Sequence, residues 1–366
     1  MKRLYLLFFI VCISCSFNEH EPSLEQLKSI SNTNIKATVL TNDSIIWSDY
    51  LVDIINNKLI IQNFKTDYAF SFFSIENNHL IKEKEVVRKG NGPFEMIYPA
   101  CFVDQTNKRI YFYDINDAYI TIYEVETHPF ERIYQTSTWT KDLLSDLNGY
   151  FWCMNGGFAM MNDSTYIALG GTLDKGNMLT FVQKHSHNVI DSNINFPKDN
   201  NEAENMIKRQ VYNNGGLKKR PTGNQFLYYC LEGNYAEIIT VESLNKTTRK
   251  ILVNDLPVYS TASNGINPKG DDNNLRGLKA YTTQQYIYLM PYPLRHKDFV
   301  DKDNYKGYPT YYNDIIYVFN WSGDFVNSYT LDQLINTFVV TDDDTSIFAS
   351  SITKNGEYQI VKFSLL

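Results

Sequence analysis

Short apolar runs separated by turns rich in Asn and Asp are the feature that most constrains how this chain folds. Residues 56–87 contain three such runs, residues 99–136 contain four, and four strands in about forty residues suit one blade of a β-propeller. The chain has 27 Tyr and 22 Phe among its 366 residues, and these side chains fit a pleated, half-buried sheet surface. The strands expected in the first two blades are 58–64, 68–75, 79–87, 99–104, 109–115, 119–125 and 130–136.

The rest of the chain fits four further blades less regularly. Their expected strands are 150–155, 165–170, 178–185 and 189–196; 225–231, 236–242 and 247–253; 277–281, 285–290, 315–320 and 325–331; and 337–340, 346–350 and 358–364. We expect residues 35–40 to supply the missing strand of the last blade, because closing the ring with both chain ends removes free sheet edges. The predicted fold is therefore all-β, a six-bladed β-propeller whose last blade is closed by an N-terminal strand. A β-sandwich with a second β domain is the alternative.

Helical patterns are few and short. They are expected at 142–147, 201–211 and 331–335, and the second lies in a polar stretch, 199–224, that is interpreted as an excursion from the ring. An insertion at 291–312, rich in Pro, Tyr, Lys and Asp, interrupts the fifth blade.

The N-terminus has the pattern of a bacterial export signal. Lys2 and Arg3 precede an apolar run, residues 4–13, that is too short to span a bilayer as a helix but matches a signal-peptide core. The small residue Ser14 directly before Cys15 resembles a lipobox, in which the cysteine is acylated and becomes the first mature residue; an ordinary signal peptide cleaved nearby is the alternative. We therefore expect a lipoprotein signal peptide at 1–14, a flexible tether at 15–34 and the propeller at 35–366.

Cysteine usage and net charge narrow the classes of function. Cys101, Cys153 and Cys230 lie in apolar contexts and are expected to be buried free thiols, since their number is odd and the chain has no CxxC motif. The net charge of −7 argues against a nucleic-acid partner, which needs a basic surface.

Several motifs resemble a known family. Residues 87–95, Val-Arg-Lys-Gly-Asn-Gly-Pro-Phe-Glu, are similar to a signature found between early blades of TolB-like six-bladed propeller lipoproteins of Bacteroidetes, with Phe94 where glycine is usual. Residues 275–289 and 315–344 are similar to the last two blades of the same family. The resemblance implies the fold and an outer-membrane lipoprotein, facing the periplasm or the cell surface. It implies no activity and no catalytic residues.

Other clusters favour structural interpretations. Arg88 and Glu95 flank a Gly/Pro turn, and fixing the crossing between blades is favoured over a ligand-facing pair. The acidic runs 271–274 and 342–344 lack the full spacing of a calcium-binding loop. His185 and His187 have no nearby carboxylate or cysteine that would complete a metal site with them. No metal site is therefore expected. No nucleophile motif or cofactor fingerprint is present, and no cofactor is expected.

Aromatic and cationic residues in the expected loops are the candidates for a binding surface. Flat aromatic rings beside Arg suit stacking on sugars or gripping peptides, whereas packing between blades is the structural alternative. The candidate ligand-facing residues are Arg88, Trp139, Trp152, Arg276, Tyr281, Arg295 and His296.

The predicted function is that of an envelope lipoprotein whose propeller binds a glycan, a peptide or a protein partner, held to the lipid bilayer by N-terminal acylation. The alternatives are a carbohydrate-active hydrolase or lyase that uses the central funnel, and a scaffold subunit of an envelope complex. Paired carboxylates or a histidine in the funnel would favour the enzyme, which is the less favoured interpretation.

Overall fold

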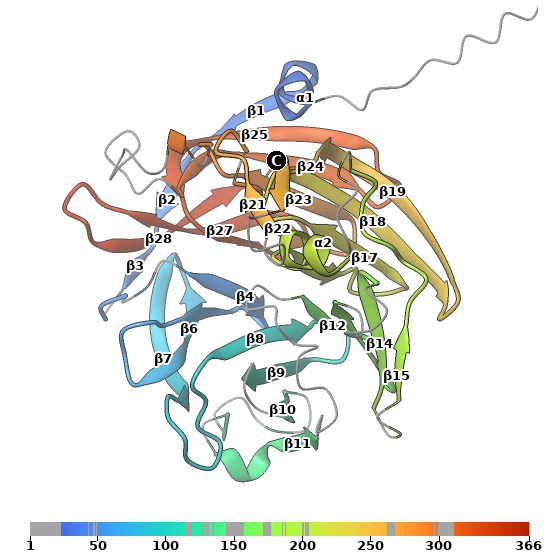
Figure 1. The fold of residues 1–366 in the computed structure, drawn as a ribbon. Helices are drawn as coiled ribbons and strands as arrows, with labels where there is room; N and C mark the ends of the chain where they lie inside the picture. The colour runs from blue at the N-terminus through green and yellow to red at the C-terminus, as the bar shows by residue number, and fades with distance from the viewer. Residues whose placement is uncertain are drawn as a thin grey trace, which may run out of the picture.

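Six small sheets stand around a common axis in the computed structural model, which confirms the predicted six-bladed β-propeller (Figure 1). The expected strand periodicity reaches from the first to the last blade, and two α-helices lie outside the sheets among the residues that the structure describes. The structure describes residues 23–42, 44–46, 48, 50–114, 119–125, 128, 132–133, 135–143, 157–170, 177–184, 186, 188–199, 201, 205–261, 268–274, 276–295, 297–298 and 311–365.

The first three blades each contain four consecutive antiparallel strands, numbered from the ring axis outward. Blade 1 consists of β4 (Leu51–Ile55), β5 (Lys58–Gln62), β6 (Tyr68–Glu76) and β7 (His79–Arg88). Blade 2 consists of β8 (Pro99–Asp104), β9 (Arg109–Asp114), β10 (Tyr119–Glu124) and β11 (Thr140–Leu143), the last preceded by a 3-10 turn, η2 (Thr136–Thr138). Blade 3 consists of β12 (Phe158–Asn162), β13 (Thr165–Leu169), β14 (Leu179–Gln183) and β15 (Val189–Asp191).

The last three blades follow the same plan, but blade 6 has only three strands from its own segment. Blade 4 consists of β16 (Gly216–Lys219), β17 (Gln225–Tyr229), β18 (Asn234–Ser243) and β19 (Lys246–Asp255). Blade 5 consists of β22 (Leu278–Thr282), β23 (Tyr286–Pro291), β24 (Asn313–Asn320) and β25 (Phe325–Ile335), and blade 6 of β26 (Phe338–Val340), β27 (Ser346–Ile352) and β28 (Tyr358–Ser364).

The chain near its N-terminus closes the ring, as predicted. Residues 32–42, here called the N-terminal belt, pair in turn with the outer strands of three neighbouring blades. Strand β1 (Asn32–Ile35) runs parallel to β25, β2 (Ala37–Val39) runs antiparallel to β28, and β3 (Thr41–Asn42) runs parallel to β7. Strand β2 thereby completes blade 6, while β1 and β3 tie blades 5 and 1 to it.

Regular secondary structure begins within the segment that was predicted to be a flexible tether. Helix α1 (Leu24–Ile30) starts with a capping box, in which the Ser23 hydroxyl accepts from the Gln26 N–H and the Gln26 side chain accepts from the Ser23 N–H. Leu24 and Leu27 are buried in a cluster with blades 4 and 5, so burial adds to local capping. The prediction of a flexible segment up to residue 34 is therefore wrong from Leu24 onward.

Several predicted strands and helices are corrected by the structure. The fourth strand of blade 2 is β11, not 130–136, and the first strand of blade 3 is β12, whereas 150–155 lies outside the described residues. Residues 142–143 belong to β11, and 331–335 end the long strand β25, because that segment stays in the sheet instead of turning into a helix.

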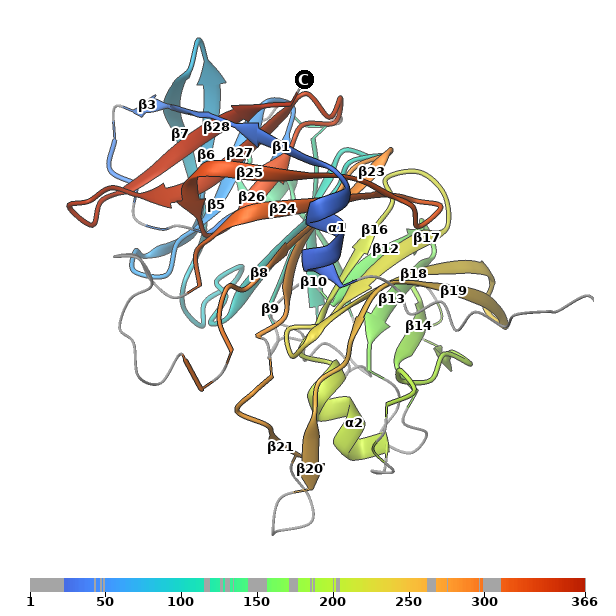
Figure 2. The same ribbon diagram turned by 90° about the horizontal axis from the view of Figure 1, so that it is seen from above.

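The excursion between blades 3 and 4 contains the expected helix, here α2 (Asn205–Tyr212). It packs beside the hairpin formed by β20 (Tyr259–Thr261) and β21 (Pro268–Gly270), and Figure 2 shows both on the same side of the ring. Asp199 joins these pieces, because its carboxylate accepts from the hydroxyls of Tyr212 at 2.7 Å and Tyr259 at 2.6 Å. None of the helices in the described ranges has the length and apolar character needed to cross a bilayer.

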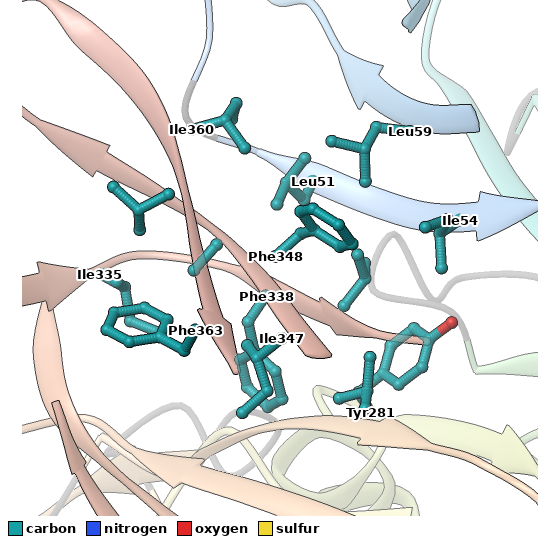
Figure 3. Close-up of a cluster of buried hydrophobic side chains, with 14 of the residues drawn as sticks. Leu51, Ile54, Leu59, Tyr281, Ile335, Phe338, Ile347, Phe348, Ile360 and Phe363 are labelled. Atoms are coloured by element: carbon teal, nitrogen blue, oxygen red, sulfur yellow. The ribbon is translucent and has the colours of Figure 1, made fainter. Parts of the chain in front are cut away.

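The core is a series of apolar wedges between neighbouring blades. The wedge between blades 2 and 3 is aromatic, since Phe102 stacks on Tyr111 with ring centroids 4.4 Å apart and meets Phe158 edge-on at 5.0 Å. The largest wedge joins blades 5, 6 and 1 beneath the belt, where Leu51, Phe348 and Phe363 are among its members (Figure 3). Side chains from the first and last blades therefore share one buried cluster.

Two adjacent belt residues test this closure. Leu40 is 1% exposed within the wedge of blades 5, 6 and 1, whereas Val39 is 47% exposed. We expect Leu40→Ala to lower the free energy of unfolding by about 2–5 kcal/mol, because it leaves a cavity at the ring seam. Val39→Ala is the control and is expected to change it by less than about 0.5 kcal/mol. Urea unfolding followed by tryptophan fluorescence measures both, and equal effects would contradict the role assigned to the belt.

Candidate functional site

The innermost strands of the six blades surround a channel along the ring axis. Each blade of four antiparallel strands returns the chain to the face from which it started, so all inner strands begin at one face, here called the mouth face. The connections that follow β15, β19 and β23 leave from this face. The long excursions of the sequence therefore begin and end at this face of the ring.

A buried polar cluster crosses the middle of the channel. Asp53, on β4, is 8% exposed, and its Oδ1 accepts from the Tyr281 hydroxyl at 2.6 Å and from Gln105 Nε2 at 3.2 Å. The Ile54 N–H donates to the same oxygen at 2.8 Å. These bonds join blade 1 to blades 2 and 5, and the hydroxyl of Tyr281 points out of the apolar wedge that holds its ring (Figure 3).

Two more chemically active side chains face this cluster. Lys218, on β16, and Cys101, on β8, line the channel on both sides of the contact between Tyr281 and Asp53. Burial raises the pKa of Asp53, and the positive charge of Lys218 and the donated hydrogen bonds only partly oppose this effect. Burial, then the Asp53 carboxylate, also raises the pKa of the Cys101 thiol, which keeps it protonated and unreactive.

Lys218 is the free cation of the cluster. Its side chain is half-buried, and within the described ranges its ammonium group makes no hydrogen bond or ion pair. A half-buried ammonium without such a bond retains its donors for a bound molecule. The channel therefore offers convergent polar groups and is not merely filled with apolar side chains.

The mouth end of the channel is a cavity of about 120 Å³. Tyr50, Phe338 and Tyr292 line it together with Lys279, whose Nζ donates to the carbonyl of Tyr311 at 2.9 Å and lies 4.5 Å from the Tyr292 ring centroid. The Arg276 guanidinium lies 5.9 Å from that same centroid. Burial, with a smaller effect of Tyr50, raises the pKa of Tyr292 to about 12, so the phenol stays neutral at the rim.

The opposite end has a smaller cavity of about 80 Å³. Asp104 lines it, but this carboxylate closes its own turn, accepting from the N–H groups of Thr106 and Asn107 at 3.1 Å and from Asn107 Nδ2 at 2.8 Å. Asp53 and Asp104 therefore have separate bonding partners and do not share a proton.

The predicted ligand-facing residues fall into separate places. Tyr281 lies in the channel, Arg276 at its mouth, and Arg295 on the mouth face, where its Nη1 donates to the Asn273 carbonyl at 2.6 Å. Trp139 is buried between blades 1 and 2, stacked on Phe112 with centroids 5.1 Å apart, so it serves packing. Trp152 and His296 lie outside the described residues, as does Cys15.

The turn around Arg88 fits its structural interpretation. Arg88 is exposed and lies 3.7 Å from Glu95, whose other carboxylate oxygen accepts from the Gly92 N–H at 2.9 Å. Phe94 adopts φ +63°, the left-handed region that glycine favours, and its ring contacts Trp139 edge-on with centroids 6.3 Å apart. Packing against the Trp139 ring offsets the conformational cost of a bulky residue there.

The acidic runs also close turns. Asp271 Oδ1 accepts from the Asn273 N–H at 2.7 Å, and Asp343 Oδ1 accepts from the Thr341 hydroxyl at 2.6 Å. Within the part of the chain that the structure describes, no three His, Cys, Asp or Glu side chains are grouped to hold a metal ion. His185 and His187 lie outside these residues.

Sequence reasoning missed Asp53, Gln105 and Lys218. The signal for Asp53 was a single carboxylate within the apolar strand Leu51–Ile55, which is costly unless the group is bonded. Lys218 lies within the stretch 199–224 that was interpreted as an excursion from the ring, but it belongs to β16, the inner strand of blade 4, which was not predicted from the sequence.

Comparisons with known proteins agree with this geometry. A model of TolB-like six-blade propeller proteins matches residues 29–343. A solved member of the DUF4221 family from Bacteroides vulgatus ATCC 8482 superposes with a TM-score of 0.53 at 12% identity, over 91% of this chain and 96% of its own. A predicted exported protein from Bacteroides fragilis NCTC 9343 gives 0.56 at 13% identity, over 91% and 95%. No curated protein matches the sequence. Likeness at such identities concerns the fold alone.

The burial of Asp53 makes a prediction about pH. A carboxyl whose folded pKa is raised binds more protons in the folded state, so its contribution to stability falls as pH rises from about 4 through the folded pKa. Asp53→Asn keeps an acceptor for Tyr281 but cannot ionise. We expect the stability of this variant, relative to the parent, to increase between pH 4 and pH 7, measured by urea unfolding at each pH. A constant or decreasing difference would contradict the burial assigned to Asp53, and Asp324→Asn on an exposed turn is the control.

Proposed function

The chain belongs to the TolB-like six-bladed β-propeller family, and we therefore propose that it is an envelope lipoprotein whose propeller is a binding module for a glycan, peptide or protein partner. The observation that carries the binding role is the mouth face. It combines the long connections with a channel whose mouth is lined by aromatic rings and cations and whose centre holds the free ammonium of Lys218. Rigid polar groups that converge in a concave site are typical of ligand recognition.

The anchor is argued from the N-terminal sequence. Lys2, Arg3, the apolar run 4–13 and the pair Ser14-Cys15 match a lipoprotein signal, and acylation of Cys15 would place the protein on a membrane. The occurrence of the fold in a predicted exported protein of Bacteroides fragilis supports an envelope location.

The ordered N-terminus limits how such an anchor would hold the ring. Residues 16–22 separate Cys15 from Ser23, and a fully extended chain over this interval spans at most about 30 Å. Helix α1 follows at once and packs on blades 4 and 5, while blade 2 lies on the opposite side of the ring (Figure 1). The edge formed by blades 4 and 5 would therefore lie nearest the membrane, with blades 1 and 2 pointing away from it.

Two cysteines of the signal region test the anchor. We expect Cys15→Ala to move nearly all of the protein from the membrane to the soluble fraction of its native type of host, because no acyl chain can be attached. Cys12→Ala removes a thiol three residues away and is expected to leave the protein membrane-bound. Ultracentrifugation and labelling with an alkynyl fatty acid measure both. Membrane retention of the Cys15 variant would overturn the lipoprotein proposal.

Site-specific photo-crosslinking in intact cells tests the binding role. A photoreactive phenylalanine analogue at Tyr98 or Arg295 places a probe on the mouth face, and the same analogue at Val326, which is 42% exposed on β25, is the control. We expect discrete cross-linked species from at least one mouth position and none from position 326, read by gel shift and mass spectrometry. Absence of adducts at both mouth positions, or equal adducts at position 326, would contradict a mouth-face binding module.

A further inference from the structure

A second concave surface opens on the mouth face between blades 1 and 2. This blade 1–2 groove has a volume of about 440 Å³, within the range of ligand sites. Its lining residues come from the ends of blade 1 strands and the start of blade 2: Tyr50, Gln62, Asn63, Phe64, Lys89, Ile97, Tyr98, Pro99 and Ala100. Tyr50, Gln62 and Ala100 also line the mouth cavity of the channel, so the two spaces adjoin.

The groove gathers large apolar side chains that are exposed. Phe64 is 62% exposed, Tyr98 55% and Ile97 47%. Single apolar residues scattered over a surface need no explanation, but three that line one concavity mark an interaction site. Binding would remove these side chains from water, at roughly 25 cal/mol per Å² of apolar surface buried.

The groove walls are held rigid by buried groups. The N–H groups of Ile97 and Tyr98 both donate to Asp114 Oδ2, the second at 2.8 Å, and Asp114 is 3% exposed. On the facing wall, Gln62 Nε2 donates to the Pro99 carbonyl at 2.8 Å. The exposed rings are therefore displayed on backbone that is already ordered, which lowers the entropic cost of binding.

Among the described residues of this lining, Lys89 is the one that carries a charge. Its backbone N–H donates to the Asp67 carbonyl at 2.8 Å, which fixes its place at the end of blade 1, and within the described ranges its ammonium group forms no ion pair. Lys89 is partly exposed, and burial lowers the pKa of its ammonium group, an effect that the Asp67 carboxylate partly opposes. A carboxylate on the bound molecule would complement this ammonium group.

The polar groups of the lining favour a peptide over a sugar. A sugar needs several free donors and acceptors for its hydroxyls, but Asn63 Nδ2 is bonded to Ser71 Oγ at 2.8 Å, and Gln62 is bonded as described above. Phe64, Ile97 and Tyr98 offer exposed apolar surface instead. Apolar side chains and one carboxylate fit this combination better than a ring of hydroxyls does.

We propose that the blade 1–2 groove binds an extended peptide segment of a partner protein, with apolar or aromatic side chains against Phe64, Ile97 and Tyr98 and a carboxylate beside Lys89. This inference rests on the proposed binding function and specifies its partner. The groove lies on the part of the ring that faces away from the edge carrying α1, so a partner would reach it without meeting the membrane.

The probe is a library of random twelve-residue peptides displayed on phage, which is selected on the Cys15→Ala protein because this variant is expected to be soluble. We expect enriched peptides to combine aromatic or branched apolar residues with Asp or Glu. The affinity of synthetic, fluorescently labelled versions of these peptides is then measured by fluorescence anisotropy for the parent protein and for variants of the groove. Phe64→Ser should weaken binding at least about tenfold, as the loss of a central anchor does. Lys89→Glu should weaken it by a similar factor and reverse its salt dependence. Val326→Ser, an apolar exposed residue on the far edge, should stay within about twofold.

Three results would overturn the proposal. The first is a selection that enriches no sequence, and the second is peptides whose affinity is unchanged in both groove variants. The third is that an acidic oligosaccharide, with oligogalacturonate as the probe, binds in a way that depends on Phe64 while the peptides do not bind. Urea unfolding of each variant shows that it is folded, and Phe64 and Lys89 are not buried, so their loss should not unfold the ring. Cross-linking at Arg295 without peptide binding at the groove would leave the mouth-face function standing while removing this inference.

Discussion

The ring depends on the backbone hydrogen bonds that residues 32–42 make to β25 and β28, from the far end of the chain, and to β7 of blade 1. A propeller built from consecutive sheets has one seam, where the first and last blades meet without a covalent link. Here the seam is crossed by β2 on β28, and secured on both sides by β1 on β25 and β3 on β7. Because the wedge of blades 5, 6 and 1 lies beneath the same residues, hydrogen bonding and apolar burial close the ring at one place.

Much of this architecture was predictable, because propeller blades are local structures. Strand alternation and Asn turns are short-range signals, and they located β5, β6 and β7 of blade 1 and the four strands of blade 5 closely, although they missed β4. The errors have physical reasons. Residues 331–335 looked helical alone but extend a strand that pairs with its neighbours, and α1 and β1 are stabilised by contacts with blades 4 and 5 that no local pattern reports. The secondary structure of these segments was determined by their burial against other blades and not by their intrinsic helix or strand propensity.

The site was less accessible to sequence reasoning, because the channel is built from one strand of each blade. Tyr281 and Arg276 were selected for their residue type, and Tyr281 lies in the channel while Arg276 lies at its mouth. Trp139 was selected on the same grounds but is a buried core residue between blades 1 and 2. Asp53 and Lys218 come from blades 1 and 4, and only closure of the ring brings them near each other. Their residue types were visible in the sequence, but their convergence was not.

The N-terminal belt also divides the outer rim of the ring into two unlike halves. In the described sheets, blades 5, 6 and 1 end in strands supplied by residues 32–42, while blades 2, 3 and 4 end in β11, β15 and β19. Unpaired strand edges invite lateral pairing with another chain, and β19 carries Lys246, Arg249 and Lys250, charges that disfavour it. Protection against sheet-to-sheet aggregation thus comes from a covering strand on one half of the rim and, on blade 4 of the other half, from charged side chains on the edge strand, of which Arg249 is paired with Glu237.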